Sequence, residues 1–331
     1  MTTQDLFPQG QDWFWSDYWR SGAAACCFTA GGENYGREIV QLWNEFFDRL
    51  PPGARILDIG TGNGAVAIIA AEARTRRGAQ FEIHGIDRAE IFSDQTRVFN
   101  PAVHGAIAFK PGIGAEALPF EDSSFDAVVS QFALEYTDMD RSIGEIARVT
   151  KPGGHVRFVV QAREPGLMST TQAQLASIQF VGEKGIVSGA RDFLSSTAHL
   201  TTVAQADATQ KQAAAEAAIE LARLLKTLDD GIKVLSAPTF LSEVKRSLVD
   251  VFQRRSAAGA PASISRLDDL ARAVEAHRRR LAAMTASAKD ERGARAIAAQ
   301  LESAGFKAEP IAAVRQPQKP DVFAWQISAS K

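Results

Sequence analysis

The run Ile56–Gly64 has the residue types and spacing of a ligand-binding turn. A short apolar strand leads to the carboxylate of Asp58, and glycines follow at every second position, at 60, 62 and 64. Glycine lets the backbone turn tightly and approach a ligand without a Cβ in the way. A helix is predicted from Ala65 to about Thr75, and its first N–H groups have no partner within the helix. The run therefore predicts a site for a polar ligand.

Two classes of cofactor compete for this turn. Gly60, Gly62 and Ala65 satisfy the G-x-G-x-x-G/A pattern of dinucleotide sites, which on its own is a weak match. Asp58 favours a different ligand, because a buried carboxylate repels a pyrophosphate and attracts an ammonium group. S-adenosyl-L-methionine (SAM) carries an amine and a sulfonium and has no phosphate. A purely structural glycine turn would explain neither Asp58 nor the alternating glycines, so SAM is favoured.

Three later runs share their order and spacing with one protein family. Phe81–Asp87 reads as a second strand that ends in an acid, and Gly114–Asp126 contains A-E-A-L-P-F followed by S-S-F-D. Arg148–Gly154 ends in Lys-Pro-Gly-Gly before an apolar strand, and proline with paired glycines ends a helix and reverses the chain. With D-x-G-x-G-x-G at Asp58–Gly64, the chain resembles the class I SAM-dependent methyltransferases over residues 53–162.

The resemblance implies a SAM site built from several segments. Asp87 would accept hydrogen bonds from both ribose hydroxyls, which suits a bidentate acceptor. Members of the family place an aspartate against adenine at the position of Gly114. Here Ala115 and Glu116 are left as candidates, or adenine is bound by backbone or recognised more weakly. The residues assigned to the cofactor on this basis are Asp58, Gly60, Thr61, Gly62, Gly64, Asp87, Arg88, Ala115, Glu116, Gln131 and Phe132.

Aromatic residues gather near the start of the chain, in Trp13–Trp19. In many members of the family an N-terminal segment with Trp or Tyr closes over the cofactor, which makes Trp15 and Tyr18 candidates for a lid. The same aromatics equally suit an anchor of the arm to the core or to a second subunit. A helix with one apolar face follows, and Pro51–Gly53 ends it.

The loop Ser130–Tyr136 faces the methyl group in members of the family. Glu135 is its one carboxylate. It would serve as a base for an alcohol or phenol acceptor, or as a helix-cap or salt-bridge residue. The loop lacks the (D/N)-P-P-(Y/F/W) signature of enzymes that methylate nucleic-acid bases or glutamine, and it has no Pro-Cys nucleophile. A small-molecule acceptor is therefore favoured, and no cysteine–histidine set predicts a metal site.

The elements that position these residues form an α/β core. Strands and helices alternate over residues 53–162, which predicts a parallel sheet with right-handed crossovers. By the resemblance the fold is Rossmann-like with seven strands. The closing elements come at the end of the chain, over residues 293–331: a helix from Ala294, then strands over Phe306–Arg315 and Asp321–Ser328. Residues 1–52 form the N-terminal arm and helix.

A long segment, residues 163–292, interrupts the core before these closing elements. Apolar periodicity predicts helices in it over Ala213–Leu228, Phe240–Arg255 and Ser265 to about Ala288, with breaks at Asp229–Gly231 and Ala257–Pro261. Ser265 with Asp268 resembles a capping pair. Ligands bind at the carboxyl ends of parallel strands, and the segment leaves from such an end. A cap over the substrate is therefore favoured ahead of a homodimer interface.

Composition excludes several classes of protein. The 331 residues are 45% hydrophobic and 23% charged, as in an ordinary globular protein. With 37 basic and 39 acidic residues the net charge is -2, which argues against wholesale binding to nucleic acid. No run is long enough to span a bilayer, and the first ten residues do not resemble a signal peptide. The adjacent Cys26 and Cys27 are read as free thiols, so a cytoplasmic location is expected.

The predicted function is transfer of a methyl group from SAM to an oxygen, nitrogen or carbon atom of a small hydrophobic metabolite. The sulfonium is itself a good leaving group, so the protein mainly aligns the partners and excludes water. One alternative is an assembly protein of the same fold, whose helical segment mediates oligomerisation with little or no methyl transfer. Another is a protein or RNA methyltransferase, which would need a basic channel that the composition does not predict.

Overall fold

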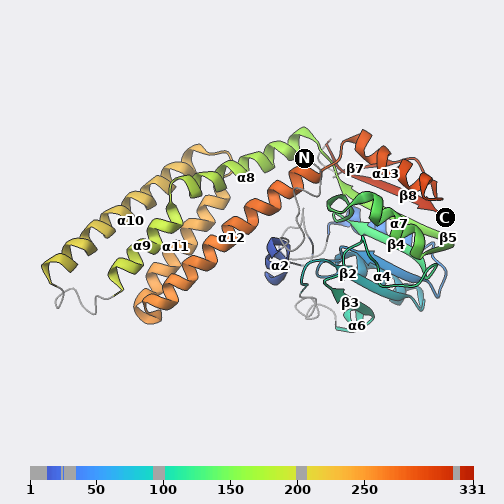
Figure 1. Ribbon diagram of the computed structural model, residues 1–331, viewed down its shortest axis with the longest axis horizontal. Coiled ribbons are helices and arrows are strands. Elements are labelled where there is room, and N and C mark those ends of the chain that lie inside the picture. The colour runs from blue at the N-terminus through green and yellow to red at the C-terminus, as the bar shows by residue number, and fades with distance from the viewer. Residues whose placement is uncertain (1–12, 24, 26–34, 92–100, 199–206, 316–320) are drawn as a thin grey trace. The chain divides into compact units, whose positions relative to one another are not determined.

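The computed structural model describes residues 13–23, 25, 35–91, 101–198, 207–315 and 321–331. The chain divides into two compact units, one formed by Met1–Pro165 with Ala283–Lys331 and the other by Gly166–Ala282 (Figure 1). Cys26 and Cys27 lie outside the described residues. Among the helices of the described ranges, none is both long and apolar enough to cross a lipid bilayer.

The first unit is built on one sheet with the strand order β3-β2-β1-β4-β5-β8-β6, and β7 also pairs with β8. Strands β1 to β5 are parallel, and β8 runs antiparallel to β5. The bounds are β1 Arg55–Ile59, β2 Glu82–Asp87, β3 Ile107–Pro111, β4 Phe125–Gln131, β5 Thr150–Gln161, β6 Lys307–Ala308, β7 Ala312–Arg315 and β8 Val322–Ser330. The predicted Rossmann-like α/β fold is confirmed.

Helices cover both faces of this sheet. The helices among the described residues of this unit are α2 Trp13–Arg20, α3 Arg37–Phe47, α4 Ala65–Arg77, α6 Pro101–His104, the 3-10 helix η1 Leu134–Tyr136, α7 Met139–Val149 and α13 Glu291–Ser303. On one face α3 packs against α4, and on the other α7 packs against α13. Phe125, Ile146 and Phe158 are fully buried between the sheet and α7. Because both faces are covered, the central strands are nearly continuous in apolar residues.

The closing residues form three strand segments where two were predicted. The stretch Phe306–Arg315 is split into β6 and β7, and both segments pair with β8. Pro310 lies between them, and proline has no N–H with which to continue a ladder. This split accounts for the eighth segment of a sheet expected to have seven strands.

The second unit consists of helices around its own apolar core. They are α8 Pro165–Glu183, α9 Ile186–Thr197, α10 Ala208–Val234, α11 Pro238–Ala258 and α12 Ala260–Ser287. Leu224, Leu228, Leu241 and Leu267 are buried in this core. Sequence patterning did not find α8, in which small and polar residues dilute the apolar stripe. It also missed α9, although Ile186, Val187, Ala190 and Leu194 form a buried apolar face on that helix.

The predicted helix break at Asp229–Gly231 is wrong, because α10 continues through it to Val234. A Cβ at Gly231 would lie only 2.7 Å from Cε1 of Phe180. The glycine therefore leaves room for the ring of Phe180 to pack against the side of α10. A glycine within a helical pattern is ambiguous for this reason, since it marks either an end or a close contact.

The capping pair predicted from Ser265 and Asp268, at the start of the last helix of the second unit, is also wrong. Helix α12 begins at Ala260, so Ser265 lies inside it, and Asp268 forms an ion pair with Arg191 at 2.7 Å. The predicted break at Ala257–Pro261 is confirmed, since α11 ends and α12 begins there.

The chain leaves and rejoins the first unit at paired residues. Just beyond β5, Ala162 forms a parallel bridge with Lys289. The N–H of Lys289 donates to the carbonyl of Gln161, and the N–H of Arg163 donates to the carbonyl of Lys289, both at 2.8 Å. Both connections to the second unit therefore begin at the carboxyl end of β5.

Candidate functional site

A cavity that is partly open to solvent lies at the carboxyl ends of β1, β2 and β4. The lining residues are Trp15, Trp19, Ala25, Tyr35, Asp58, Ile59, Gly60, Thr61, Ala65, Val66, Asp87, Arg88, Ala89, Ile113, Gly114, Ala115, Glu116, Gln131, Phe132, Ala133, Tyr136 and Thr137. The structure thus gathers the cofactor residues assigned from the sequence around one cavity, apart from Gly62 and Gly64.

Protein atoms occupy the space beside the glycines of the turn. Gly60 and Gly62 adopt left-handed conformations, with φ of 68° and 54°, where glycine is favoured. A Cβ at Gly60 would lie 2.0 Å from the Cβ of Ala133, and one at Gly62 would lie 2.5 Å from the ring of Trp19. These glycines therefore leave room for the loop after β4 and for helix α2. The sequence analysis had instead expected them to leave room for a ligand.

Asp58 lies at the end of β1 with only 1% of its surface exposed. Its Oδ2 accepts hydrogen bonds from Oγ1 of Thr61 at 2.7 Å and from the N–H of Ala67 at 3.2 Å. Burial raises the pKa of this carboxyl to about 7; the two hydrogen bonds oppose the shift, and the charge of Asp87 adds to it. A buried acid that is costly to ionise is stabilised in its charged form by a cationic ligand.

Asp87 ends β2 with its carboxylate held by backbone groups. Oδ2 accepts from the N–H of Gly62, and Oδ1 accepts from the N–H of Ala89, both at 2.8 Å. A carboxylate offers about four acceptor positions, and these two bonds fix its orientation. Its predicted role toward ribose hydroxyls is compatible with this orientation.

Helix α2 is fastened to the glycine turn by Asn63. The side-chain amide of Asn63 donates to the carbonyls of Trp19 at 2.9 Å and Ala23 at 2.8 Å. Asn63 is fully buried, and it satisfies a carbonyl in the last turn of α2 and another in the residues that follow the helix. The arm therefore packs on the core at the edge of the cavity.

The two residues proposed as a lid differ in position. Trp15 lines the cavity, and its ring meets that of Tyr136 edge to face with 5.6 Å between centroids. Tyr18 is not among the lining residues, and its hydroxyl donates to the carbonyl of Ala25 at 2.9 Å. Trp19, one helical turn after Trp15, lines the cavity in its place.

Gln131, the last residue of β4, presents a buried donor beside the cavity. The indole N–H of Trp43 donates to its Oε1. Because an indole N–H only donates, this bond fixes which way the amide points. The Nε2 group is buried and has no hydrogen-bond partner among the described residues. An unpaired buried amide is costly, and an acceptor oxygen beside it would relieve that cost.

Phe132 follows in a left-handed conformation, with φ of 53°, which is rare for a bulky residue. Its N–H donates to the carbonyl of Val159 at 2.8 Å. Its ring packs against Tyr35, with 6.1 Å between centroids, and against Phe323. Strained backbone held by its surroundings is found preferentially at functional sites, and here it supports the cavity wall.

Glu135 lies behind the cavity wall and does not line it. One of its carboxylate oxygens accepts from the N–H of Gln161 at 2.8 Å, and the other has no hydrogen-bond partner in the described part of the chain. Burial raises the pKa of Glu135 to about 7, against the bond from Gln161 and the charge of Lys289. The carboxylate ties η1 to the end of β5, and its role as a base stays a prediction.

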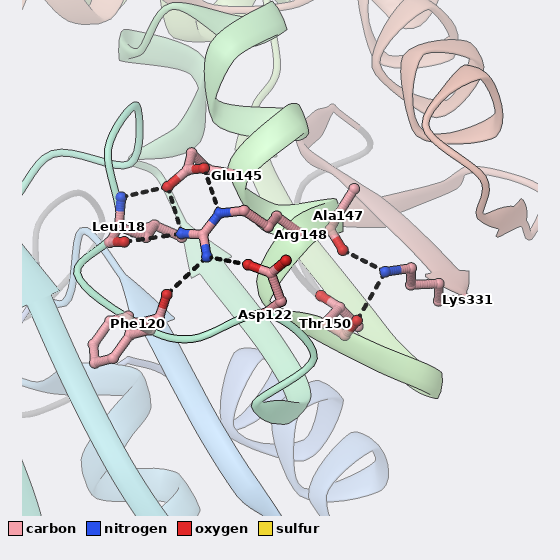
Figure 2. Close-up of polar contacts among 8 residues, drawn as sticks. All are labelled: Leu118, Phe120, Asp122, Glu145, Ala147, Arg148, Thr150 and Lys331. Atoms are coloured by element: carbon pink, nitrogen blue, oxygen red, sulfur yellow. Dashed lines mark hydrogen bonds and ion pairs between the residues drawn. The ribbon is translucent and has the colours of Figure 1, made fainter.

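Helix α7 holds the loop that follows the Ala115–Glu116 pair (Figure 2). The guanidinium of Arg148 donates to both carboxylate oxygens of Glu145, to Asp122, and to the carbonyls of Leu118 and Phe120, at 2.7–2.9 Å. Glu145 in turn accepts from the N–H of Leu118 at 2.6 Å. The backbone of Leu118 is thus held at both its N–H and its carbonyl, which fixes the loop against the helix.

Replacing Arg148 with methionine is expected to lower the free energy of unfolding by about 2–3 kcal/mol, because five hydrogen bonds are lost and two loop carbonyls lose a partner. Lysine should recover little, since one ammonium cannot match the planar fork of a guanidinium. Urea denaturation measures both variants. Arg295→Ala, which removes an exposed pair with Glu291, should change the value by less than about 0.5 kcal/mol. If the Arg148 and Arg295 variants lowered the free energy of unfolding equally, Arg148 would not hold the loop as described.

The cavity fits the parts of SAM. Asp58 suits an ammonium group, Asp87 suits sugar hydroxyls, and the amide of Gln131 suits a carboxylate oxygen. Among the described lining residues, Arg88 is the one cation, and it lies 3.6 Å from Glu116. Three carboxyl groups, those of Asp58, Asp87 and Glu116, line the same cavity and would repel a pyrophosphate, so a dinucleotide fits less well.

Comparisons with known proteins agree with this geometry. Residues 57–158 match the model of a methyltransferase domain family. These residues form a class I SAM-dependent methyltransferase domain. SAM is therefore its cofactor, and the matched region runs from β1 into β5.

Individual relatives match this methyltransferase domain over part of their length. The ubiquinone/menaquinone biosynthesis C-methyltransferase UbiE of Xanthomonas oryzae is 31% identical over 143 residues, covering 40% of this chain and 56% of the relative. The ubiquinone biosynthesis O-methyltransferase of Alkalilimnicola ehrlichii is 34% identical over 114 residues, covering 34% and 44%. Among solved structures, the YcgJ protein from Bacillus subtilis is 22% identical with a TM-score of 0.34, covering 43% and 59%. The chain spans about half the length of the curated relatives.

Sequence reasoning missed three aromatic residues of the methyltransferase cavity. Trp19 carried a usable signal, because it lies four residues after Trp15 and so on the same face of a helix. Tyr136 belongs to the loop after β4 that was expected to face the methyl group. Tyr35 lies outside the regular elements, where no periodic pattern marks a residue.

Proposed function

We propose that this protein is an enzyme that transfers a methyl group from SAM to a small hydrophobic metabolite. The observation that carries the proposal is the cavity in which Asp58, Asp87 and Gln131 present groups that match SAM. When bound, SAM supplies an electrophilic methyl group on a good leaving group. The residues of the chain bind and orient the two reactants and exclude water.

The aromatic wall supports an apolar acceptor. Trp15, Tyr35, Phe132 and Tyr136 line the same cavity, and their rings offer flat apolar surface. Such a wall also keeps water, a competing nucleophile, away from the methyl group. Two relatives are named for ubiquinone biosynthesis, which favours a small molecule as acceptor over a polymer.

In this proposal Glu135 positions the loop after β4, and residues 163–292 enclose the acceptor. The burial of Glu135 and its bond to Gln161 favour a positioning role over that of a base. The connections to the helical residues begin at the carboxyl end of β5, beside the strand that ends in Gln131. The proposal also includes a homodimer contact through residues 163–292 and a cytoplasmic location.

Methyl transfer is tested with SAM labelled in its methyl group. The purified protein is incubated with the small-molecule, protein and RNA fractions of a cell extract, and labelled product is separated from SAM. We expect label in an organic-extractable compound from the small-molecule fraction. Label confined to protein or RNA would contradict the acceptor class, and absence of SAM binding by calorimetry would contradict the function itself.

The role of the helical unit is tested by replacing Gly166–Ala282 with a short glycine-serine linker. The bridge between Ala162 and Lys289 holds the two ends of the gap together, so the shortened protein should fold and bind SAM with unchanged affinity. Acceptor turnover should fall by roughly a hundredfold, because the acceptor is no longer held in line with the methyl group. Full turnover by the shortened protein would rule out enclosure of the acceptor.

A further inference from the structure

Helix α3 brings the ring of Trp43 against the end of β4. Trp43 is fully buried, and its ring stacks on that of Phe47 with 5.8 Å between centroids and meets that of Phe46 edge to face. A buried indole N–H needs an acceptor, and this one donates to Oε1 of Gln131, 88 residues later in the chain. The packed rings therefore fix the N–H, and the N–H fixes the amide of Gln131.

Gln131 and Asp58 project from the same face of the sheet. Strands β1 and β4 are parallel neighbours, and Asp58 is paired with Val129. Gln131 follows Val129 by two residues, and side chains alternate along a strand, so Gln131 and Asp58 share a face. On this face Asp58 contacts α4 through Ala67, and Gln131 contacts α3 through Trp43. Both side chains line the cavity, so an acid and an amide donor lie there on neighbouring strands.

On the basis of the proposed function, we propose that Trp43 is a positioning residue, which holds the Nε2 group of Gln131 toward the carboxylate of the methionine part of SAM. Turned the other way, the amide would present its carbonyl oxygen, which attracts an ammonium group and repels a carboxylate. The fixed donor of Gln131 and the acid of Asp58 thus distinguish the two charged groups of an amino acid.

The indole N–H matters because both ends of the amide are buried. Gln131 is only 5% exposed, and its Nε2 group has no hydrogen-bond partner among the described residues. With Trp43 in place, Oε1 is already satisfied when Nε2 meets an oxygen of the ligand. Without the indole N–H, turning Nε2 to the ligand would leave Oε1 buried without that donor, and this would weaken binding of the carboxylate.

Calorimetry with two probes tests the proposal. S-adenosyl-L-homocysteine carries the carboxylate, and S-adenosyl-3-thiopropylamine has the same amine without it. The unaltered protein should prefer the first by roughly tenfold to a hundredfold, as expected for a hydrogen bond to a charged group. Trp43→Phe keeps a ring and removes the N–H, and it should reduce this preference to less than about fivefold. Phe47→Leu disturbs packing on the same helix and leaves the N–H in place, so the preference should remain even if both affinities fall.

Substitutions at Gln131 separate positioning from a merely structural role of Trp43. Gln131→Met removes the amide and should lower the preference, and Trp43→Phe should then have no further effect on it. Gln131→Glu should reverse the preference, because one oxygen accepts from Trp43 and the other presents negative charge to the carboxylate of the probe.

Thermal unfolding shows which variants keep the fold. A full preference in a folded Trp43→Phe protein, or a Gln131→Glu protein that still prefers S-adenosyl-L-homocysteine, would overturn the assignment. The second measurement decides even if Trp43→Phe does not fold. If neither probe bound the unaltered protein, the proposed function itself would fail.

Discussion

Replacing Asp87 with alanine is expected to weaken SAM binding by roughly a hundredfold or more. The carboxylate is proposed to accept hydrogen bonds from two ribose hydroxyls, and a hydrogen bond to a charged group contributes about 1.5–3 kcal/mol. Because 1.4 kcal/mol corresponds to tenfold in affinity, two such bonds account for about two orders of magnitude or more. The variant also removes the acceptor of the Gly62 N–H, which orients the glycine turn. Calorimetry with SAM measures the change.

A matched control for Asp87 is available three residues later. Glu90 is an exposed acid whose nearest ion-pair partner, Arg20, is 3.8 Å away and itself half exposed. Glu90→Ala should change SAM affinity by less than about twofold, since exposed pairs contribute little. Thermal unfolding of Asp87→Ala shows whether the fold is retained. Affinity within about threefold of the parent in a folded Asp87→Ala protein would remove Asp87 from the site.

The core of the fold was predictable because each of its elements carries a local pattern. The apolar run before Asp58 predicts a buried strand, and the alternating glycines predict the turn into α4. Asp87 was found through its position at the end of the next strand. Patterns of this kind report contacts within a few residues, so they located the strands, the turn and many of the residues that line the cavity.

Contacts between distant segments were not predictable in the same way. The glycine at 62 is required by the ring of Trp19, and the one at 231 by the ring of Phe180. Neither ring is near its glycine in sequence. Gln131 became interpretable only once Trp43 was seen to fix its amide. In each case the informative feature is a packing or hydrogen-bond partner that the chain brings from another element.

Replacing Asp58 with asparagine is expected to stabilise the protein without ligand, increasingly so as the pH rises. The folded protein keeps the proton of Asp58 up to about pH 7, whereas an unperturbed carboxyl loses it near 3.8. The folded state therefore binds more protons over this range, and the free energy of unfolding falls as the pH rises from about 4 to 7. One pKa unit corresponds to about 1.4 kcal/mol, so the advantage of the variant should grow by about 2–3 kcal/mol between pH 5 and 8. Urea denaturation at the two pH values measures it.

The same carboxyl should also make SAM binding depend on pH. The affinity for SAM should rise with pH, whereas the free energy of unfolding of the ligand-free protein falls. The ammonium of SAM favours the ionised form of Asp58, so binding lowers its pKa and releases a proton. Below pH 7 the affinity should therefore fall by up to about tenfold per pH unit, and it should level off above pH 7. Calorimetry in buffers of different ionisation enthalpy measures the proton released.

Two variants assign this pH dependence to Asp58. Asp58→Asn should bind SAM more weakly at pH 8 and lose most of the dependence between pH 5.5 and 7, where an α-amino group keeps its proton. Glu135→Gln removes the other buried carboxyl whose pKa is raised to about 7, and that carboxyl does not line the cavity. Its affinity for SAM should follow the same pH curve as the parent. If the slope disappeared in Glu135→Gln and persisted in Asp58→Asn, the cation-binding role of Asp58 would be wrong, because the proton released on binding would then come from behind the cavity wall.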